Sequence, residues 1–555
     1  MYKFAVTLSL LTHLLATLCL PTQECPILGP VLPSEFDIAQ TDAFLNATEL
    51  FPRQLELLFS SGVLNRTSSS FSVDVFSSVT NTSIYSYNHD ATDLHEALTT
   101  GELTDNTLFR IGSVSKLFTV YALIAAAGIE IFNDPVTKHL PELAGNIGRA
   151  AVESIIWEDV TVGALASHQA GVGGFILETA ACTELGTCNV SDFLAQMRDN
   201  KRPTTSAFET PIYADSGFGI LARVLERLTR LEYGQAIHNT LSVPLGLNTI
   251  STFKPEGDAV DGLIVPGSLA ESSWGFDNQI TAGSGGIYAN GADLRTIGLS
   301  ILHSQLLPPA ATRRWMKPLG SVAALSESVG APWEINRLAL PVTSNSTRTR
   351  ISDLYTKAGG QAGYGSIFAL SPDHNIGFTI NVAGATAGRD RWVLRDLVGE
   401  TFVVAAEHAA AEYAAQNYVG TFVDDSIDGT NLTVTVDDDK PGLGLASMFW
   451  NSTEVRTALV SLQPLPIPAE NVTVRLYPTG LQDGTRRVFR AVVEYYPIEP
   501  RAAIEGGQGL FNNGCAAWLS AAFYPDSDSL ILDIVDGQLE SVTSVLFNST
   551  MRRVA

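Results

Sequence analysis

Residues 109–116 read FRIGSVSK, and in this stretch a serine, Ser113, precedes a lysine, Lys116, by three positions. The apolar residues that follow recur at helical spacing until Gly128, which predicts a helix over residues 113–127. Side chains three positions apart lie on the same face of a helix. A hydroxyl placed there lies near the positive end of the helix dipole and within reach of an amine that can take or relay its proton, so the pair suits nucleophilic catalysis.

The spacing of this pair is not specific by itself. A serine that caps a helix gives the same pattern without any catalytic role. Ser251 and Lys254 share the spacing, but Pro255 and Gly257 follow, and no helix can hold that second pair in register. The choice between the two pairs therefore depends on what the rest of the chain offers.

Two further segments offer groups for acyl transfer. Residues 213–215 read YAD and precede a predicted helix, and residues 357–360 read KAGG on a predicted strand. Taken with residues 109–116, they resemble in type and order the motifs of the serine β-lactamase and penicillin-binding protein superfamily, especially the class C β-lactamases and related esterases and D,D-peptidases. The extended architecture looks most like secreted fungal β-lactamase-like proteins that add a C-terminal β domain. The resemblance covers roughly residues 70–405 and includes, in order, FNDPV at 132–136, LPEL at 140–143, VTV at 160–162, HQAG at 168–171, PLGL at 244–247 and GGIY at 285–288.

What the resemblance implies is a covalent serine mechanism. Ser113 would attack the substrate carbonyl, while Lys116 and Tyr213 share the proton transfer. A tyrosine with an ordinary pKa of about 10 acts as a base only where cations favour its phenolate, and Lys116 and Lys357 are the two candidates. The backbone N–H groups of Ser113 and Gly360 would form the oxyanion hole. The alternative for Tyr213 is an aromatic side chain that only packs on the core.

The expected substrate-binding residues depart from the family's pattern at two positions. The second motif usually ends in asparagine, whereas Asp215 offers only acceptors when it is ionised. The third motif usually has a threonine or serine where Ala358 stands, so a hydroxyl that helps to hold the carboxylate of a β-lactam is missing. Both changes weaken the prediction of β-lactam hydrolysis and favour neutral esters or similar acyl groups. The predicted substrate-binding set is Asp215, Ala358, Gly359 and Gly360.

Signatures of other hydrolases are missing from the sequence. There is no Gly-x-Ser-x-Gly elbow and no His-x-His or His-Glu-x-x-His set for zinc, so neither a metal nor another cofactor is expected. His168 could be taken for a base, but it lies in a stretch that is usually structural in the family, and we interpret it as a non-catalytic histidine. Residues 283–286, GSGG, lead into no helix with a lysine and predict a flexible loop near the cleft.

Composition and charge exclude some partners. The chain has 34 Lys and Arg against 58 Asp and Glu, and its net charge of −24 repels nucleic-acid phosphates and anionic lipids. Residues 1–21 have one lysine, an apolar stretch and a final proline, which is the pattern of a secretory signal peptide, and no later stretch is apolar enough for a membrane anchor. Nine Asn-x-Ser/Thr sequons agree with a secreted, glycosylated protein.

The cysteines also indicate an oxidising compartment. Four of them remain after removal of the signal, and four cysteines allow three connectivities. The most local closure would join Cys182 to Cys188, which leaves Cys25 to pair with Cys515 and to tie the N-terminus to the C-terminal domain. We therefore expect two disulfides and favour this pairing.

The length suits a large enzyme domain and one accessory domain. We expect a signal peptide at residues 1–21, a β-lactamase-like domain at 22–416 and a β-rich, lipocalin-like barrel at 417–555, where the composition changes to short β-type runs. The fold class is α+β, with the helix-flanked antiparallel sheet and helical subdomain that the resemblance implies, and an all-β C-terminal domain. Other expected elements are a hairpin over 71–88, helices over 218–229, 292–302 and 391–416, and strands over 351–370 and 376–382.

These observations predict a secreted serine hydrolase that cleaves an ester, amide or lactone in a small molecule or peptide through an acyl-enzyme on Ser113. An acyltransferase is the nearest alternative, because an alcohol or amine can resolve the same acyl-enzyme when water is excluded. A binding protein that kept the fold and lost turnover is the third possibility, and it is motivated by Asp215 and Ala358. The intact set of Ser113, Lys116, Tyr213 and Lys357 favours an enzyme.

Overall fold

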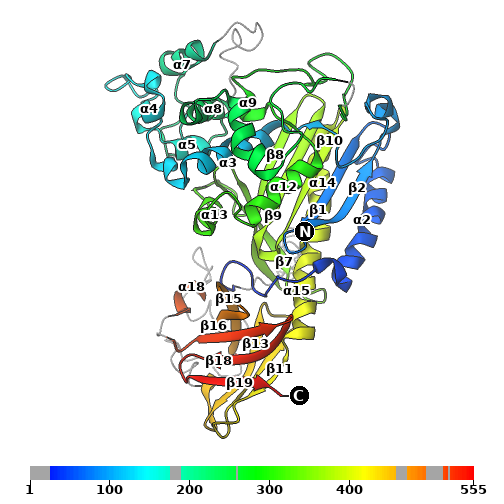
Figure 1. Ribbon diagram of the computed structural model, residues 1–555, viewed down its shortest axis with the longest axis vertical. Helices are drawn as coiled ribbons and strands as arrows, with labels where there is room; N and C mark the ends of the chain where they lie inside the picture. Colours follow the sequence, from blue (N-terminus) through cyan, green and yellow to red (C-terminus); the bar gives the residue numbers. More distant parts are fainter. Residues whose placement is uncertain are drawn as a thin grey trace, which may run out of the picture. The chain divides into compact units, whose positions relative to one another are not determined.

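The structure is a computed structural model that describes residues 25–174, 189–257, 260–457, 472–495, 517–522 and 526–554. The described chain divides into two compact units (Figure 1). The first, the sheet unit, comprises Ala47–Arg337 and Asp353–Phe402; the second, the barrel unit, comprises Leu338–Ser352 and the described residues up to Asn46 and from Val403 onward. No helix among these residues is long and apolar enough to cross a membrane. The predicted signal peptide at residues 1–21 lies outside the described residues.

An eight-stranded sheet lies at the centre of the sheet unit, counted over the described residues, in the order β2-β1-β10-β9-β8-β7-β6-β5. The strands are β1 Ser70–Ser77, β2 Thr82–His89, β5 Gly320–Ser321, β6 Glu327–Val329, β7 Glu334–Pro341, β8 Thr349–Gln361, β9 Tyr364–Ser371 and β10 Ile376–Ala383. β1 pairs antiparallel with β2 and β10, and β9 pairs antiparallel with β8 and β10. The hairpin predicted over 71–88 and the strand predicted over 376–382 are therefore confirmed. The stretch predicted as strand over 351–370 is a hairpin of β8 and β9 with a turn at residues 362–363.

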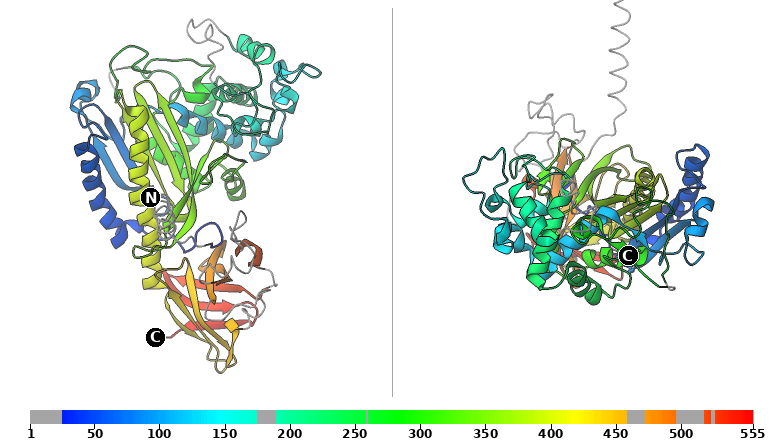
Figure 2. Two further views of the ribbon diagram at one scale, coloured as in Figure 1. Left: turned by 180° about the vertical axis from the view of Figure 1, so that it is seen from behind. Right: turned by 90° about the horizontal axis from the view of Figure 1, so that it is seen from above.

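Helices cover both faces of this sheet (Figure 1 and Figure 2). On one face, Phe76 of β1 fills space left by Gly377 of β10 and by Gly298 of α12 (Gly291–Leu302). On the opposite face, Gly365 of β9 lies against Ala387 of α14 (Ala387–Val398). Because helices cover both faces, β1, β9 and β10 are buried along their whole lengths, including the polar Ser72 and Asp74 of β1.

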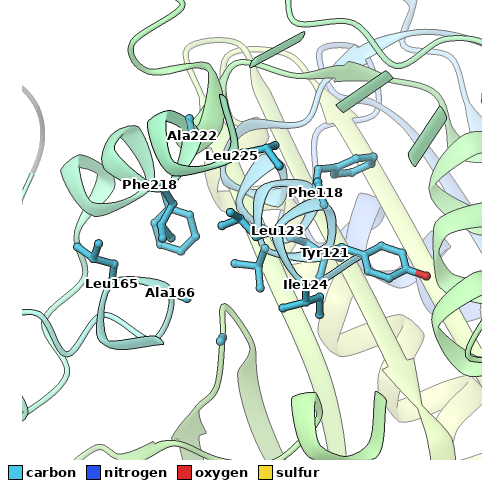
Figure 3. Packing of buried hydrophobic residues seen from close by; sticks show 14 of the residues in the cluster. Phe118, Tyr121, Leu123, Ile124, Leu165, Ala166, Phe218, Ala222 and Leu225 are labelled. Atoms are coloured by element: carbon cyan, nitrogen blue, oxygen red, sulfur yellow. The ribbon is translucent and has the colours of Figure 1, made fainter. Parts of the chain in front are cut away.

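A helical cluster packs beside the sheet, and its core joins three helices (Figure 3). Phe118 and Leu123 of α3 (Ser115–Ala127) lie in one buried cluster with Leu165 of α5 (Val162–Ala166) and Phe218 of α8 (Asp215–Thr229). This core holds the N-terminal ends of α3 and α8 together, where Ser113 and Asp215 stand. Further helices of this unit are α4 Val136–His139, α7 Val190–Asp199, α9 Tyr233–Ile237, α10 Val243–Leu245, α11 Ala282–Gly285 and α13 Pro309–Trp315, while α2 Asp42–Ser60 spans both units.

Three predicted elements differ from the observed ones. The helix predicted from Ser113 begins with a 3₁₀ turn, Gly112–Val114, and becomes α-helical only at Ser115. The helix predicted over 391–416 consists of α14 and α15 (Val404–Asn417), with a π-helical turn between them. Residues 283–286 were expected to be a flexible loop, but they lie mainly in α11, because Gly283 lets this helical turn approach the backbone of α8 closely. The helices predicted over 218–229 and 292–302 are confirmed as α8 and α12.

The barrel unit contains the all-β domain predicted after residue 417. Its described strands are ordered β12-β11-β19-β18-β17-β16-β15-β13-β14, and β12 also pairs with β13, which closes the sheet into a barrel. The interior is filled by buried apolar side chains such as Phe422, Leu432, Leu476 and Phe489. The prediction took this domain as the continuous residues 417–555. By packing, the unit also includes α15, Leu338–Ser352 and the described residues up to Asn46. The strands are β11 Gly420–Val423, β12 Asn431–Val436, β13 Leu443–Trp450, β14 Thr453–Glu454, β15 Val472–Asp483, β16 Arg486–Tyr495, β17 Ser529–Val535, β18 Gln538–Ser544 and β19 Ser549–Arg553, with a short helix, α18 Ala517–Ser520.

Cys25 takes part in a disulfide. Its partner lies outside the described residues, as do Cys182, Cys188 and Cys515. The pairing expected from the sequence therefore stays a prediction.

Candidate active site

The turn that precedes α3 places Ser113 against the sheet. The hydroxyl of Ser115 donates a hydrogen bond to the carbonyl of Gly112 (2.7 Å) and accepts one from the amide of Ile287 (3.0 Å), which fixes the turn. Gly112 has a φ of +50°, and a methyl group on it would lie 2.5 Å from the amide nitrogen of Gly360. Only glycine permits this approach. The backbone of Ile111 and Gly112, just before Ser113, therefore lies directly against the KAGG segment of β8.

Lys116 is fully buried, and its ammonium group donates to three oxygens. The acceptors are the hydroxyl of Ser113 at 3.0 Å, Oδ1 of Asp215 at 2.5 Å and the carbonyl of Ser284 at 2.6 Å. An ammonium group has three protons and no lone pair. Because all three protons are donated, Lys116 cannot take the proton of Ser113 in this arrangement, but it can stabilise the alkoxide that forms when another group takes it.

Tyr213 lies close to two ammonium groups. The Nζ atoms of Lys116 and Lys357 lie 5.0 and 5.2 Å from the centre of its ring. Desolvation raises the pKa of Tyr213, and so does the negative charge of Asp215. The positive charges of Lys357 and Lys116 and a hydrogen bond with Ser113 outweigh both, so the pKa lies below its ordinary value. The residue is 44% exposed, which leaves its ring accessible to a substrate. Tyr213 is therefore the group best suited to accept the proton of Ser113.

Lys357 is held by a carboxylate that the sequence patterns did not reveal. Its fully buried Nζ donates to Glu334 Oε1 and to the carbonyl of Ala358 (2.9 Å), while the amide of Ala358 donates to Glu334 Oε2 (2.9 Å). Burial lowers the pKa of Lys357, but the negative charge of Glu334 and the phenol of Tyr213 outweigh burial and raise the pKa above its ordinary value. Lys357 therefore remains an ammonium group across the neutral range and supports the phenolate.

A third cation, Arg391 of α14, lies over the KAGG segment. Its guanidinium donates to the carbonyl of Gly359 and occupies the space where Gly360 would carry a side chain, so a larger residue at position 360 would displace the guanidinium. Burial lowers the pKa of Arg391, whereas the charges of Glu334 and Tyr213 raise it. The amide nitrogen of Gly360, placed beside the turn of Ser113, is in the position expected for the second donor of an oxyanion hole.

The structure brings the predicted site residues together within the sheet unit. Ser113, Lys116, Tyr213 and Lys357 converge, and the expected substrate-binding residues Asp215, Ala358, Gly359 and Gly360 line the same place. The alternative pair, Ser251 and Lys254, is not held together by a helix. Ser251 donates to the carbonyl of Phe253 (2.6 Å), and neither residue is helical.

Sequence reasoning missed Glu334, Arg391 and the carbonyl of Ser284. The only available signal was indirect, because a lysine on a buried strand requires a counter-ion. No spacing indicated which acidic residue would supply it. His168, interpreted as non-catalytic, is buried, and its ring stacks on Tyr213 at 4.4 Å. Burial, and then the charges of Lys116 and Lys357, hold the pKa of His168 well below its usual range.

The site carries three cations and two carboxylates. Lys116, Lys357 and Arg391 face Asp215 and Glu334, which leaves one positive charge in excess. Such a site favours one added negative charge, either on a phenolate or on a substrate oxyanion. Within the described ranges, no group of three or more His, Cys, Asp or Glu side chains is arranged to hold a metal ion.

Two family models match the chain. Residues 86–400 match the model described as "Beta-lactamase", and residues 410–555 match the model described as "Beta-lactamase-like-like, C-terminal domain". The first match covers more than half of the 555 residues. The first matched region contains most of the eight-stranded sheet, and the second contains the strands of the barrel.

Individual proteins show more distant similarity. A "Beta-lactamase-like protein" from Arthroderma benhamiae is 26% identical over 518 residues, which cover 85% of this chain and 84% of that protein. The "Probable hydrolase clz13" of Cochliobolus lunatus is 22% identical over 510 residues, covering 82% and 77%. Among solved structures, a D-stereospecific amidohydrolase from Streptomyces sp. matches with a TM-score of 0.48 and 19% identity, covering 64% of this chain and 98% of that one.

Proposed function

Because the chain belongs to the β-lactamase family, whose named members include hydrolases, we propose that it is a secreted serine hydrolase that cleaves an ester, amide or lactone through an acyl-enzyme on Ser113. The observation that supports this most directly is the hydrogen bond from the buried ammonium of Lys116 to the Ser113 hydroxyl. A helix-capping serine would stand at the N-cap and accept from the backbone, whereas the N-cap of α3 is Val114 and that of the preceding 3₁₀ turn is Ile111.

Acylation begins with transfer of the Ser113 proton to the Tyr213 phenolate. The serine oxygen forms a bond to the substrate carbonyl carbon, and the π electrons move to the carbonyl oxygen, which accepts hydrogen bonds from the amides of Ser113 and Gly360. Collapse of this intermediate breaks the bond to the leaving group. The departing oxygen or nitrogen takes the proton from Tyr213, which restores the phenolate.

Deacylation repeats these steps with water. Tyr213 takes a proton from water, hydroxide adds to the acyl carbon, and the bond to the Ser113 oxygen breaks. The serine oxygen recovers its proton from Tyr213. Lys357 stays protonated throughout, because the charge of Glu334 raises its pKa, and Lys116 keeps its ion pair with Asp215.

The substrate class follows from the two departures in the motifs. Asp215 places a negative charge next to Lys116, and Ala358 offers no hydroxyl for an anionic substrate. Both features favour a neutral acyl group over a β-lactam with its carboxylate. Secretion is supported by the predicted signal peptide and by the disulfide of Cys25.

A fluorophosphonate probe tests the nucleophile. We expect the probe to label Ser113 in the full-length protein, as located by peptide mass mapping, and not to label S113A. The matched control is S251A, since Ser251 has the same spacing to a lysine but lies in a turn. Lack of labelling of the folded wild type would contradict the proposal and favour a binding protein.

A substrate panel then tests the reaction. We expect p-nitrophenyl esters to be hydrolysed much faster than nitrocefin, with both rates lost in S113A. Addition of an alcohol acceptor distinguishes a hydrolase from an acyltransferase, because acceptor consumption that outruns hydrolysis would assign transfer as the main reaction. Rapid Ser113-dependent turnover of nitrocefin would contradict the expected preference for neutral esters.

A further inference from the structure

We propose that His168 is a positioning residue for Tyr213. As a neutral imidazole, it binds the backbone of the residues before and after Tyr213 and stacks on the tyrosine ring. This proposal rests on the proposed function, because it assumes that Tyr213 is the base. His168 acts through Tyr213 and is assigned no contact with Ser113 or with the substrate.

The backbone contacts bracket Tyr213. The amide of Ile212 donates to the carbonyl of His168 (2.9 Å), and the amide of Ala214 donates to Nδ1 of its ring (3.1 Å). Both neighbours of Tyr213 are thereby fixed to the same histidine. The segment is completed by Gly174, whose amide donates to the carbonyl of Tyr213 (3.0 Å).

The ring contact orients the phenol directly. The rings of His168 and Tyr213 are stacked, with centroids 4.4 Å apart and an angle of 25° between their planes. Phe218 of α8 contacts the same imidazole with a centroid distance of 5.3 Å. An aromatic platform of this kind limits rotation of the Tyr213 ring, which leaves its oxygen near Ser113.

The contact with Ala214 requires a neutral ring. Nδ1 can accept the Ala214 amide proton only when it carries no proton of its own, so the single ring proton is on Nε2. The imidazole is 7% exposed and faces the charges of Lys116 and Lys357 as well as the phenol of Tyr213. A proton on Nδ1 would give the ring a positive charge, remove the acceptor for the Ala214 amide and repel both lysines.

The backbone of His168 limits which substitutions are informative. Its φ is +61°, a region that asparagine tolerates better than most residues. H168N keeps an oxygen acceptor near the position of Nδ1 but loses the stacked ring. H168F keeps a stacked ring but loses the acceptor, and H168A loses both. Comparison of the three variants separates the effect of the hydrogen bond to the Ala214 amide from the effect of the ring stacked on Tyr213.

The test is the pH dependence of kcat/KM for a p-nitrophenyl ester, measured on the full-length protein together with the melting temperature of each variant. We expect H168A to lose about 10- to 100-fold in kcat/KM, since small displacements of a catalytic group have effects of that size. Its acid limb should move to higher pH, because a displaced Tyr213 loses the stabilisation of its phenolate by two ammonium groups. H168N should restore part of both effects.

The outcomes separate this proposal from the proposed function. If the wild type is labelled by the fluorophosphonate and H168A keeps the wild-type acid limb, His168 has only a structural role and this proposal is overturned alone. An unchanged limb in H168F, when H168A shifts, would exclude the hydrogen bond to Ala214 as the positioning contact. A wild type that is neither labelled nor active overturns both. If H168F does not fold, the comparison of H168A with H168N tests the hydrogen bond to the Ala214 amide. Equal pH profiles for these two variants would exclude a role for that hydrogen bond.

Discussion

Replacement of Lys357 by methionine removes the cation that acts most strongly on Tyr213. The variant keeps the length of the side chain but not its charge, and Nζ of Lys357 lies 5.2 Å from the centre of the tyrosine ring. The phenolate charge lies mainly on the oxygen, which hydrogen-bonds Lys357 and is closer than the ring centre, so 5.2 Å is an upper limit for the separation of the charges. At that limit the attraction is about 3 kcal/mol for an effective dielectric constant of about 20, and about 0.8 kcal/mol in bulk water. Because Tyr213 is 44% exposed, we expect a value toward the lower end of this interval.

The sign of the effect follows from the charge. Lys357 lowers the pKa of Tyr213, and the phenolate is the active form above that pKa, so its removal raises the pKa and shifts the acid limb of kcat/KM upward. The expected shift is about 0.6 to 2 pH units, from the same interaction energies at about 1.4 kcal/mol per unit. Rates measured on a chromogenic ester between pH 5 and pH 10 would give the limb directly.

The double variant K357M/E334Q is the matched control. In K357M alone, the carboxylate of Glu334 loses its partner and itself disfavours the phenolate, which adds to the shift. The double variant removes both charges and should shift the limb less than K357M. An acid limb that stays in place or moves to lower pH in K357M would refute the assignment of Tyr213 as a base supported by two cations.

Three further predictions concern residues with defined contacts. D215N keeps an acceptor for Lys116 and adds an amide donor, so we expect the rate of nitrocefin turnover relative to ester hydrolysis to rise, and an unchanged ratio would contradict the role of Asp215 in substrate choice. G112A places a methyl group 2.5 Å from the Gly360 amide nitrogen at a φ of +50°. We expect the free energy of unfolding in urea to fall by about 1–3 kcal/mol and kcat to fall as well, and wild-type values would refute the close approach. R350M leaves the buried carboxylate of Glu407 without its guanidinium, which should cost about 3–5 kcal/mol in urea unfolding, whereas R350M/E407L should cost less, and equal losses would argue against a buried ion pair.

Local patterns predicted the parts of the site that are close in sequence. Ser113 and Lys116 are three positions apart at the start of a strongly predicted helix, and a helical turn places such a pair on one face. Tyr213 and Lys357 were predicted through the resemblance, since nothing in their own segments indicates that they approach Ser113. The strands and helices around them were predicted because their apolar periodicity is strong.

The charges that balance the site could not be predicted in this way. Glu334 lies on β7 and Arg391 on α14, and each reaches the KAGG segment only through the order of the strands and the packing of a helix on the sheet. The helical turn at residues 282–285 was missed for a related reason. Its glycines have low helix propensity, and tertiary contact with α8 outweighs that propensity.

The balance of charges explains why proton transfer to Tyr213 needs little reorganisation of the site. With Tyr213 as a phenolate, the three cations face three negative charges, because Asp215 and Glu334 supply the other two. When the Ser113 proton moves to Tyr213 and the oxyanion forms on the substrate, one negative charge disappears from the phenol and one appears beside the amides of Ser113 and Gly360. The total charge is unchanged, and only its position shifts among fixed dipoles and cations. R391M removes the one positive charge in excess and D215N removes one negative charge, so R391M combined with D215N should retain more activity than R391M alone, and a double variant less active than R391M would contradict this balance of net charge.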